Sequence, residues 1–122
     1  MTLKRLQMTL QLYHYPKCST CKKARAFLDQ HGHEPALTDL VAEPISLARL
    51  KDLCKRSGLP LAKFFNTSGE SYRNGDFKTR SKQMSETELL TALSKDGKLV
   101  KRPILDAGSF VLVGFDPKAY AE

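Results

Sequence analysis

In this 122-residue chain, Cys18 and Cys21 are the residues whose types and spacing best suit catalytic chemistry. Cys18 follows Pro16 and stands where a predicted strand gives way to a predicted helix. The free N–H groups and the dipole of a helix N-terminus favour a thiolate at such a position. Lys17 and Lys22 add positive charge nearby. We therefore predict that Cys18 is a nucleophile whose pKa is lowered.

Cys21 lies one helical turn further on, where it can attack a mixed disulfide on Cys18 and close an internal disulfide. A Cys-x-x-Cys pair can also be half of a zinc site, with Cys54, His31 and His33 as the other candidate ligands. Because these three are not paired at metal-ligand spacing, we favour redox chemistry and expect no bound metal. Cys54 lies on the apolar side of another predicted helix, a position that is typical of a buried structural thiol.

Two further side chains can assist the cysteines. His14 precedes the motif and can support a positive field or assist proton transfer, or it can be a half-buried histidine at a strand end. Arg102 carries a planar guanidinium that suits an oxyanion or a carboxylate, although its residue type alone also allows a surface role. Pro103 fits the first residue of a strand or a cis bond in a tight turn.

Hydrophobic spacing predicts the elements that position these residues. It indicates a strand at residues 10–13, a helix over Ser19–Gln30 whose inner face includes His31, and a short strand within residues 35–40. A strand–helix–strand order implies a parallel pair. The cysteines are thus expected at the junction between the first strand and the following helix.

The later part of the chain is predicted to form a helical block and then a hairpin. Residues 46–97 should hold one helix near the start and another that opens with a capping box at residues 85–88. We expect residues 73–82, which carry several of the basic side chains, to lie in a loop between them. A hairpin over residues 104–113 and a short final helix follow. This order predicts an α/β fold, with helices packed on a mixed sheet.

Composition and length exclude several classes of protein. A chain of 122 residues with 41% hydrophobic residues can bury one core, and no apolar run approaches the roughly 20 residues of a membrane span. Residues 1–8 do not resemble a secretory signal, and we expect a disordered tail there before a single domain over residues 9–122. Three cysteines without an export signal predict a cytoplasmic protein. The net charge of +7 is scattered without interleaved aromatics, so nucleic acid is not an expected partner.

The chain resembles the arsenate reductase-related family, which includes ArsC, Spx and MgsR proteins, in four places: residues 12–18, the cysteine pair, residues 22–25 and residues 101–104. The resemblance covers nearly the whole chain and is closer to the reductase-like branch than to the Spx regulators. It implies a thioredoxin/glutaredoxin-like mixed sheet with a helical block inserted at about residues 46–97.

The resemblance also implies roles for single residues. Cys18 would be the nucleophile with His14 behind it, Arg102 would hold a substrate oxyanion, and Pro103 would be cis and face the cysteine loop. Arsenate reductases of this kind use two further arginines whose positions hold other residues here. Arg73 is our candidate to replace one of them.

These features together predict a thiol-dependent oxidoreductase that acts on a small oxyanion or a disulfide. No cofactor is expected to be bound, and glutathione, glutaredoxin or thioredoxin would supply electrons. A general thiol reductase fits the missing arginines and the presence of Cys21 better than an enzyme dedicated to arsenate. The alternative is an Spx-like redox-sensing regulator that binds RNA polymerase.

Overall fold

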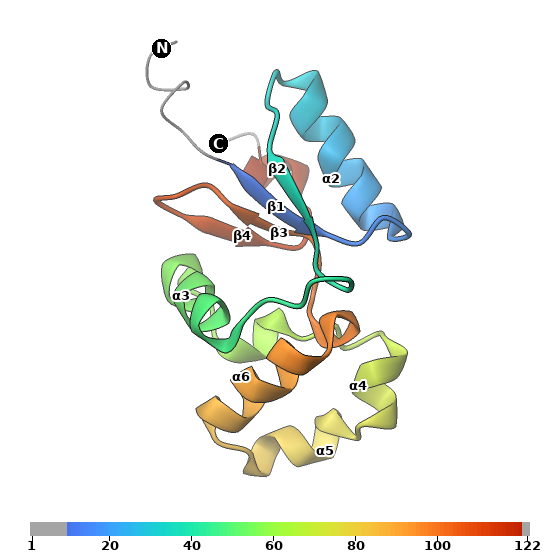
Figure 1. Cartoon of the computed structure of the whole chain (residues 1–122), viewed down its shortest axis with the longest axis vertical. Helices are drawn as coiled ribbons and strands as arrows, with labels where there is room; N and C mark the ends of the chain where they lie inside the picture. The colour runs from blue at the N-terminus through green and yellow to red at the C-terminus, as the bar shows by residue number, and fades with distance from the viewer. Residues whose placement is uncertain (1–9, 121–122) are drawn as a thin grey trace. The chain divides into compact units, whose positions relative to one another are not determined.

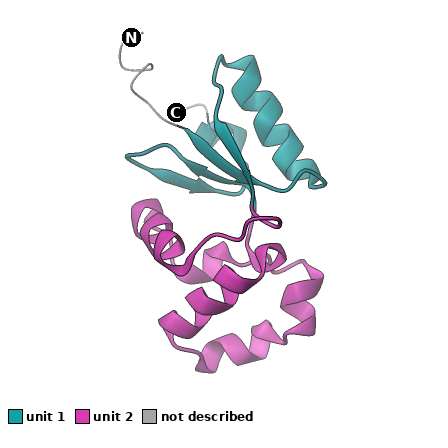
Figure 2. Cartoon of the chain, viewed as in Figure 1, with its two compact units in different colours: residues 1–39, 102–122 teal, residues 40–101 magenta. Residues whose placement is uncertain are grey.

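The computed structural model describes residues 10–120. The predicted tail at residues 1–8 therefore lies outside the described part of the chain. Contacts divide the molecule into two compact units (Figures 1 and 2). The sheet unit takes in residues 1–39 and 102–122, and the helical unit takes in residues 40–101.

Within residues 10–120, the sheet unit is built on four short strands: β1 (Gln11–His14), β2 (Ala36–Asp39), β3 (Ile104–Asp106) and β4 (Val111–Val113). Their order across the sheet is β2-β1-β3-β4. The β1–β2 pair is parallel, whereas β1–β3 and β3–β4 are antiparallel. The α/β fold with a mixed sheet is therefore confirmed.

Two helices belong to the same unit, α2 (Ser19–Gln30) and α7 (Pro117–Tyr120). α2 runs alongside the sheet (Figure 1), and its Leu28 packs in a buried cluster with Leu12 and Leu105. Burying such side chains supplies the main stabilisation of the unit.

His31 does not belong to the inner face of α2, as the apolar spacing predicted. The helix ends at Gln30, and His31 is its C-cap residue with an exposed side chain. Its Nδ1 lies 2.8 Å from the carbonyl oxygen of Phe27, and its ring stacks on the Phe27 ring at 4.1 Å. The spacing failed here because the chain leaves the helical path one residue before the position that would face the sheet.

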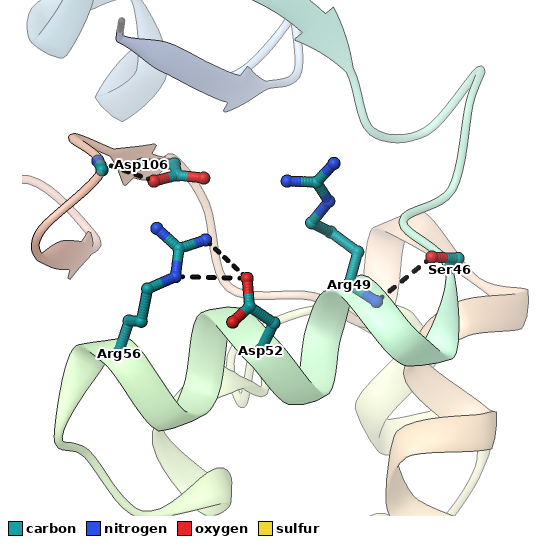
Figure 3. A network of polar contacts seen from close by, with 6 residues as sticks. Ser46, Arg49, Asp52, Arg56 and Asp106 are labelled. Atoms are coloured by element: carbon teal, nitrogen blue, oxygen red, sulfur yellow. Dashed lines mark hydrogen bonds and ion pairs between the residues drawn. The ribbon is translucent and has the colours of Figure 1, made fainter. Parts of the chain in front are cut away.

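The β3–β4 turn is closed by a side chain. Asp106 Oδ1 accepts a hydrogen bond from the Gly108 N–H at 2.9 Å (Figure 3). Gly108 has a φ of +87°, a left-handed conformation that favours glycine. The predicted hairpin is present, with its two strands at Ile104–Asp106 and Val111–Val113.

The helical unit contains α3 (Leu47–Ser57), α4 (Glu70–Asn74), α5 (Phe77–Arg80), α6 (Glu86–Lys95) and three 3₁₀ helices, η1 (Leu61–Phe64), η2 (Ser81–Gln83) and η3 (Gly97–Leu99). Ser46 caps α3 by accepting the Arg49 N–H at 3.2 Å, and Arg56 pairs with Asp52 at 2.7 Å one turn apart (Figure 3). The capping box between Ser85 and Glu88 is formed as predicted.

The prediction of a loop at residues 73–82 was wrong. The segment holds the end of α4 and all of α5. Phe77 is buried and contacts the rings of Phe65 and Tyr72, at centroid distances of 5.7 and 6.1 Å. The short Asn-Gly-Asp run between the two helices does form a turn, with Asp76 left-handed at a φ of 55°, and this turn signal obscured the helices on either side.

Candidate active site

Cys18 is the N-cap residue of α2. Its backbone is extended (φ −89°, ψ 121°), and its Sγ accepts the Cys21 N–H at 3.4 Å. The Cys18 N–H donates to the Tyr15 carbonyl oxygen at 2.9 Å and closes the loop after β1. No acidic side chain stands in the first turn of the helix. The positive end of the helix is therefore directed at a half-buried sulfur.

The surroundings of Cys18 favour the thiolate. Burial is the strongest single influence and opposes ionisation. Hydrogen bonds from the thiol and the N–H of Cys21, together with the hydrogen bond and positive charge of Arg102, outweigh it and lower the pKa of Cys18. A larger share of this sulfur is therefore anionic at neutral pH than in a free cysteine.

Cys21 has the opposite tendency. It is fully buried, and burial, reinforced by the adjacent Cys18, raises its pKa to about 12 despite a hydrogen bond from the Tyr15 N–H to its Sγ at 3.5 Å. Of the two thiols, Cys18 therefore ionises more readily and Cys21 holds its proton more firmly. This division suits an attacking and a resolving cysteine.

Arg102 is fixed beside Cys18 by an aromatic ring. Its Cζ lies 5.1 Å from the centroid of the Tyr15 ring, within the range of a cation–π contact. The Arg102–Pro103 peptide bond is cis, the geometry that the family resemblance implied, and Pro103 is fully buried. The two residues thus open β3 with the guanidinium next to the sulfur.

His14 ends β1 and is 6% exposed. The parallel register places Asp39 of β2 opposite it. Burial and the charge of Arg25 lower the pKa of His14, and Asp39 only partly opposes them. We therefore expect a neutral imidazole at pH 7, which can accept a proton but adds no positive field. Its Nδ1 has no hydrogen-bond partner among residues 10–120.

Arg73 lies in the helical unit, unlike the other candidate site residues. The sheet unit holds Cys18, Cys21, His14, Arg102 and Pro103 together. Arg73 is an exposed residue of α4, and its Nη1 donates to the Ser68 carbonyl oxygen at 2.8 Å.

Cys54 has a local structural setting in the helical unit. It is half-buried, and its Sγ lies 3.5 Å from the Leu59 carbonyl oxygen, to which it donates. Burial and the negative charge of Glu86 raise its pKa, so this thiol is a poor nucleophile at neutral pH.

Between positions 10 and 120, no three His, Cys, Asp or Glu side chains are grouped so as to hold a metal ion. The helices formed by these residues are all too short or too polar to cross a bilayer.

Sequence reasoning did not identify three residues that shape the site. Tyr15 supplies both the ring under Arg102 and an N–H to Cys21. Asp39 and Arg25 act on His14 from β2 and α2. An aromatic residue in the loop before Cys18 was a usable signal for Tyr15. The other two depend on strand register and helix orientation, which the one-dimensional pattern does not contain.

Comparison with known proteins gives the family. The uncharacterized protein YusI of Bacillus subtilis is 45% identical over 115 residues, which cover 94% of this chain and 98% of that protein. An arsenate reductase of Haemophilus influenzae is 26% identical, covering 94% and 98%. The global transcriptional regulator Spx 1 of Oceanobacillus iheyensis is 26% identical, covering 86% and 79%.

A solved structure agrees with these relatives. The crystal structure of an ArsC family related protein from Bacteroides fragilis has a TM-score of 0.90 and 38% identity, and the match covers 93% of this chain and 96% of that one. The ArsC family model matches residues 13–122, which include the whole cysteine loop, α2 and the Arg102–Pro103 pair. The chain belongs to the ArsC family.

Proposed function

We propose that this protein is a thiol-dependent oxidoreductase in which Cys18 attacks the substrate and Cys21 resolves the adduct. The observation that carries the proposal is the unequal pair of thiols: the pKa of Cys18 is lowered and that of Cys21 is raised to about 12. The similarity to an arsenate reductase of Haemophilus influenzae supports an enzyme of this general kind.

The reaction with a disulfide substrate proceeds in two displacements. The Cys18 thiolate attacks one substrate sulfur, a new S–S bond forms, and the other substrate sulfur leaves as a thiolate. Cys21 then loses its proton to that leaving thiolate and attacks the Cys18 sulfur. The substrate gains two electrons and leaves as one thiol and one thiolate, which takes a proton from water, while the protein keeps a Cys18–Cys21 disulfide. Glutathione, glutaredoxin or thioredoxin would restore the dithiol.

Two side chains assist in this scheme. Arg102, beside the sulfur, stabilises the thiolate and is placed to hold an anionic substrate. His14, neutral and buried at the end of β1, would relay the proton of Cys21 to the leaving thiolate. Arsenate is a possible oxyanion substrate. The absence of two of the arginines that the resemblance leads one to expect favours a broader thiol reductase.

Coupled assays test the proposal. Purified protein is supplied with a small aromatic disulfide or arsenate, and turnover is followed with glutathione–glutathione reductase or thioredoxin–thioredoxin reductase. Cys18→Ser should abolish turnover. Cys21→Ser should permit the first displacement and accumulate a mixed disulfide on Cys18. Cys54→Ser is the matched control and should retain turnover. Full turnover by Cys18→Ser, with loss in Cys21→Ser, would reverse the two roles.

A redox-sensing regulator is the second candidate. It is favoured by the match to the regulator Spx 1, which extends over 86% of this chain. In that case the Cys18–Cys21 disulfide would act as a switch for binding RNA polymerase. Pull-downs with purified RNA polymerase, under oxidising and reducing conditions, separate the candidates. Redox-dependent capture without any reductase turnover would favour the regulator.

A further inference from the structure

Among residues 10–120, no strand pairs with the outer edge of β2. β2 is the end strand of the sheet. The Ala36 N–H bonds to the Leu10 carbonyl oxygen at 2.8 Å, so the N–H and C=O of the next residue, Leu37, point away from β1. The Leu37 side chain is 44% exposed. Such an edge can pair with one more strand.

A groove lies between this edge and α2. Its volume is about 470 Å³, and its lining includes Lys22, Arg25 and Asp29 of α2, Glu34 and Pro35 of the connection, and Leu37 of β2. Leu37 is opposite Leu12 in the register, and Leu12 packs against Leu28 of α2. Because paired residues point to the same face of a sheet, Leu37 faces the α2 side and forms the apolar floor.

Charge is unevenly distributed along the groove. Lys22 and Arg25 stand four and seven residues after Cys18, roughly 6 and 10 Å along the helix axis. Asp29 lies one helical turn after Arg25, and Glu34 lies beyond the end of α2. All four side chains are exposed. The groove is therefore positive toward Cys18 and negative at its far end.

We propose that this groove docks an extended polypeptide segment of the disulfide partner, with an acidic residue near the partner's cysteine and an apolar side chain over Leu37. The proposal rests on the proposed function, since the segment is delivered to Cys18. An extended chain advances about 3.3 Å per residue, so an acidic residue two or three positions from the cysteine reaches Lys22 or Arg25. The segment's backbone pairs with Leu37.

Docking leaves the chemistry of the exchange unchanged. The Cys18 thiolate displaces one sulfur of the partner disulfide, and Cys21 displaces the other after passing its proton to the first sulfur released. Two electrons pass to the partner, the second sulfur released takes a proton from water so that the partner leaves as a dithiol, and the protein retains its own disulfide. What the groove adds is selection for a polypeptide with that charge pattern over a small disulfide.

Synthetic peptides test the docking. Each carries one cysteine as a mixed disulfide with thionitrobenzoate, followed by either Asp-Glu-Leu or Lys-Lys-Ser in an extended sequence, and release of thionitrobenzoate gives the rate of attack by Cys18. Hydroxyethyl thionitrobenzoate disulfide is the small reference. The acidic peptide should exceed the basic one on the order of tenfold at low salt, after division by the reference rate.

Variants locate the effect. Leu37→Ser and Arg25→Glu should each reduce the acidic peptide's normalised advantage, whereas Lys51→Glu and Lys55→Glu, exposed on α3, should leave it intact. The Cys21→Ser variant traps the mixed disulfide on Cys18. In the complex with the acidic peptide, the Leu37 amide hydrogen should exchange with solvent at least tenfold more slowly than in the complex with hydroxyethyl thiol.

Two results are decisive against docking. Equal normalised rates for the two peptides, or an unprotected Leu37 amide in the trapped complex, would overturn it while the small disulfide still reacts. Failure of every disulfide, including the small reference, to react with Cys18 would instead remove the proposed function on which the docking rests.

Discussion

At the residue scale, the reactivity of Cys18 depends on its neighbours more than on the two-cysteine motif. Burial alone would keep this sulfur protonated. Three donors, the Cys21 thiol, the Cys21 N–H and the Arg102 guanidinium, reverse that tendency. Arg102 is in turn positioned by the Tyr15 ring. The lowered pKa of Cys18 therefore depends on both the cysteine loop and the residues just before β3.

Removing the charge of Arg102 should weaken the thiolate. Arg102→Gln is expected to raise the pKa of Cys18, because a hydrogen bond and a positive charge are lost beside the sulfur. Alkylation of Cys18 at pH 7 should slow about threefold to tenfold. The neighbouring exposed Lys101→Gln is the control. An unchanged alkylation rate in Arg102→Gln would show that the guanidinium does not act on the sulfur.

His14 should make the folded state sensitive to mild acid. Its pKa is lowered on folding, so the unfolded chain binds more protons below about pH 6.5. Stability should therefore be complete above that pH and fall as the pH decreases toward the lower folded pKa, by less than about 1.4 kcal/mol for each pH unit. Urea unfolding at pH 7.5 and 5.5 measures this loss. His14→Gln should reduce it and exposed His31→Gln should not.

At the element scale, the site depends on where β1 ends and α2 begins. The hydrogen bond from the Cys18 N–H to Tyr15 and the cap at Cys18 fix this junction within a few residues. The parallel β1–β2 pair brings Asp39 opposite His14, and the antiparallel β1–β3 pair brings β3 beside β1, so that Arg102, two residues before β3, reaches the cysteine loop. Each candidate residue of the sheet unit thus comes from an end of an element.

Gly97 should be essential to the helical unit. A Cβ at this position would lie 2.7 Å from the Leu40 carbonyl carbon and from the Val41 Cα. Backbone atoms cannot move aside cheaply, so Gly97→Ala should destabilise the protein by more than about 2 kcal/mol. Gly108→Ala is the comparison, with a φ of +87° but open space, and should cost only about 1 kcal/mol. Equal losses in urea unfolding would contradict the close approach.

Much of the sheet unit could be predicted from local signals. The α2 bounds Ser19–Gln30 are as the hydrophobic spacing indicated. In contrast, α4 and α5 are only five and four residues long, too short for helical periodicity to emerge. They are held by the contacts of Phe77 with Phe65 and Tyr72, which link residues distant in sequence. The pairing of His14 with Asp39 could not be predicted either, because it also links residues that are distant in sequence.

At the scale of the whole molecule, the chain combines a sheet unit that holds the cysteine pair with a strongly basic helical unit. Residues 40–101 hold 12 of the 20 Lys and Arg side chains and seven of the 13 Asp and Glu. Cys18 and Cys21 both lie in the sheet unit, whereas the third cysteine, Cys54, lies in the helical unit. The cysteine pair and most of the net charge therefore lie in different parts of the chain.

Oxidation of the whole protein should form one disulfide. Treatment with one equivalent of diamide is expected to join Cys18 to Cys21, because the thiolate and the buried thiol are one helical turn apart. Intact mass should fall by about 2 Da, the mass of two hydrogen atoms removed in disulfide formation. Alkylation followed by peptide mapping should find only Cys54 labelled. A disulfide that includes Cys54, or three labelled thiols, would show that the motif is not a redox pair.

The most direct measurement is the rate of iodoacetamide labelling at each cysteine of the reduced native protein, followed from pH 5 to pH 9 by peptide mass spectrometry. The account predicts that Cys18 titrates below the value of about 8.5 for a free thiol and is labelled well ahead of Cys54 at pH 7. In urea-unfolded protein the two should react alike. Labelling of native Cys18 that is no faster than in the unfolded chain at pH 7 would contradict the central claim.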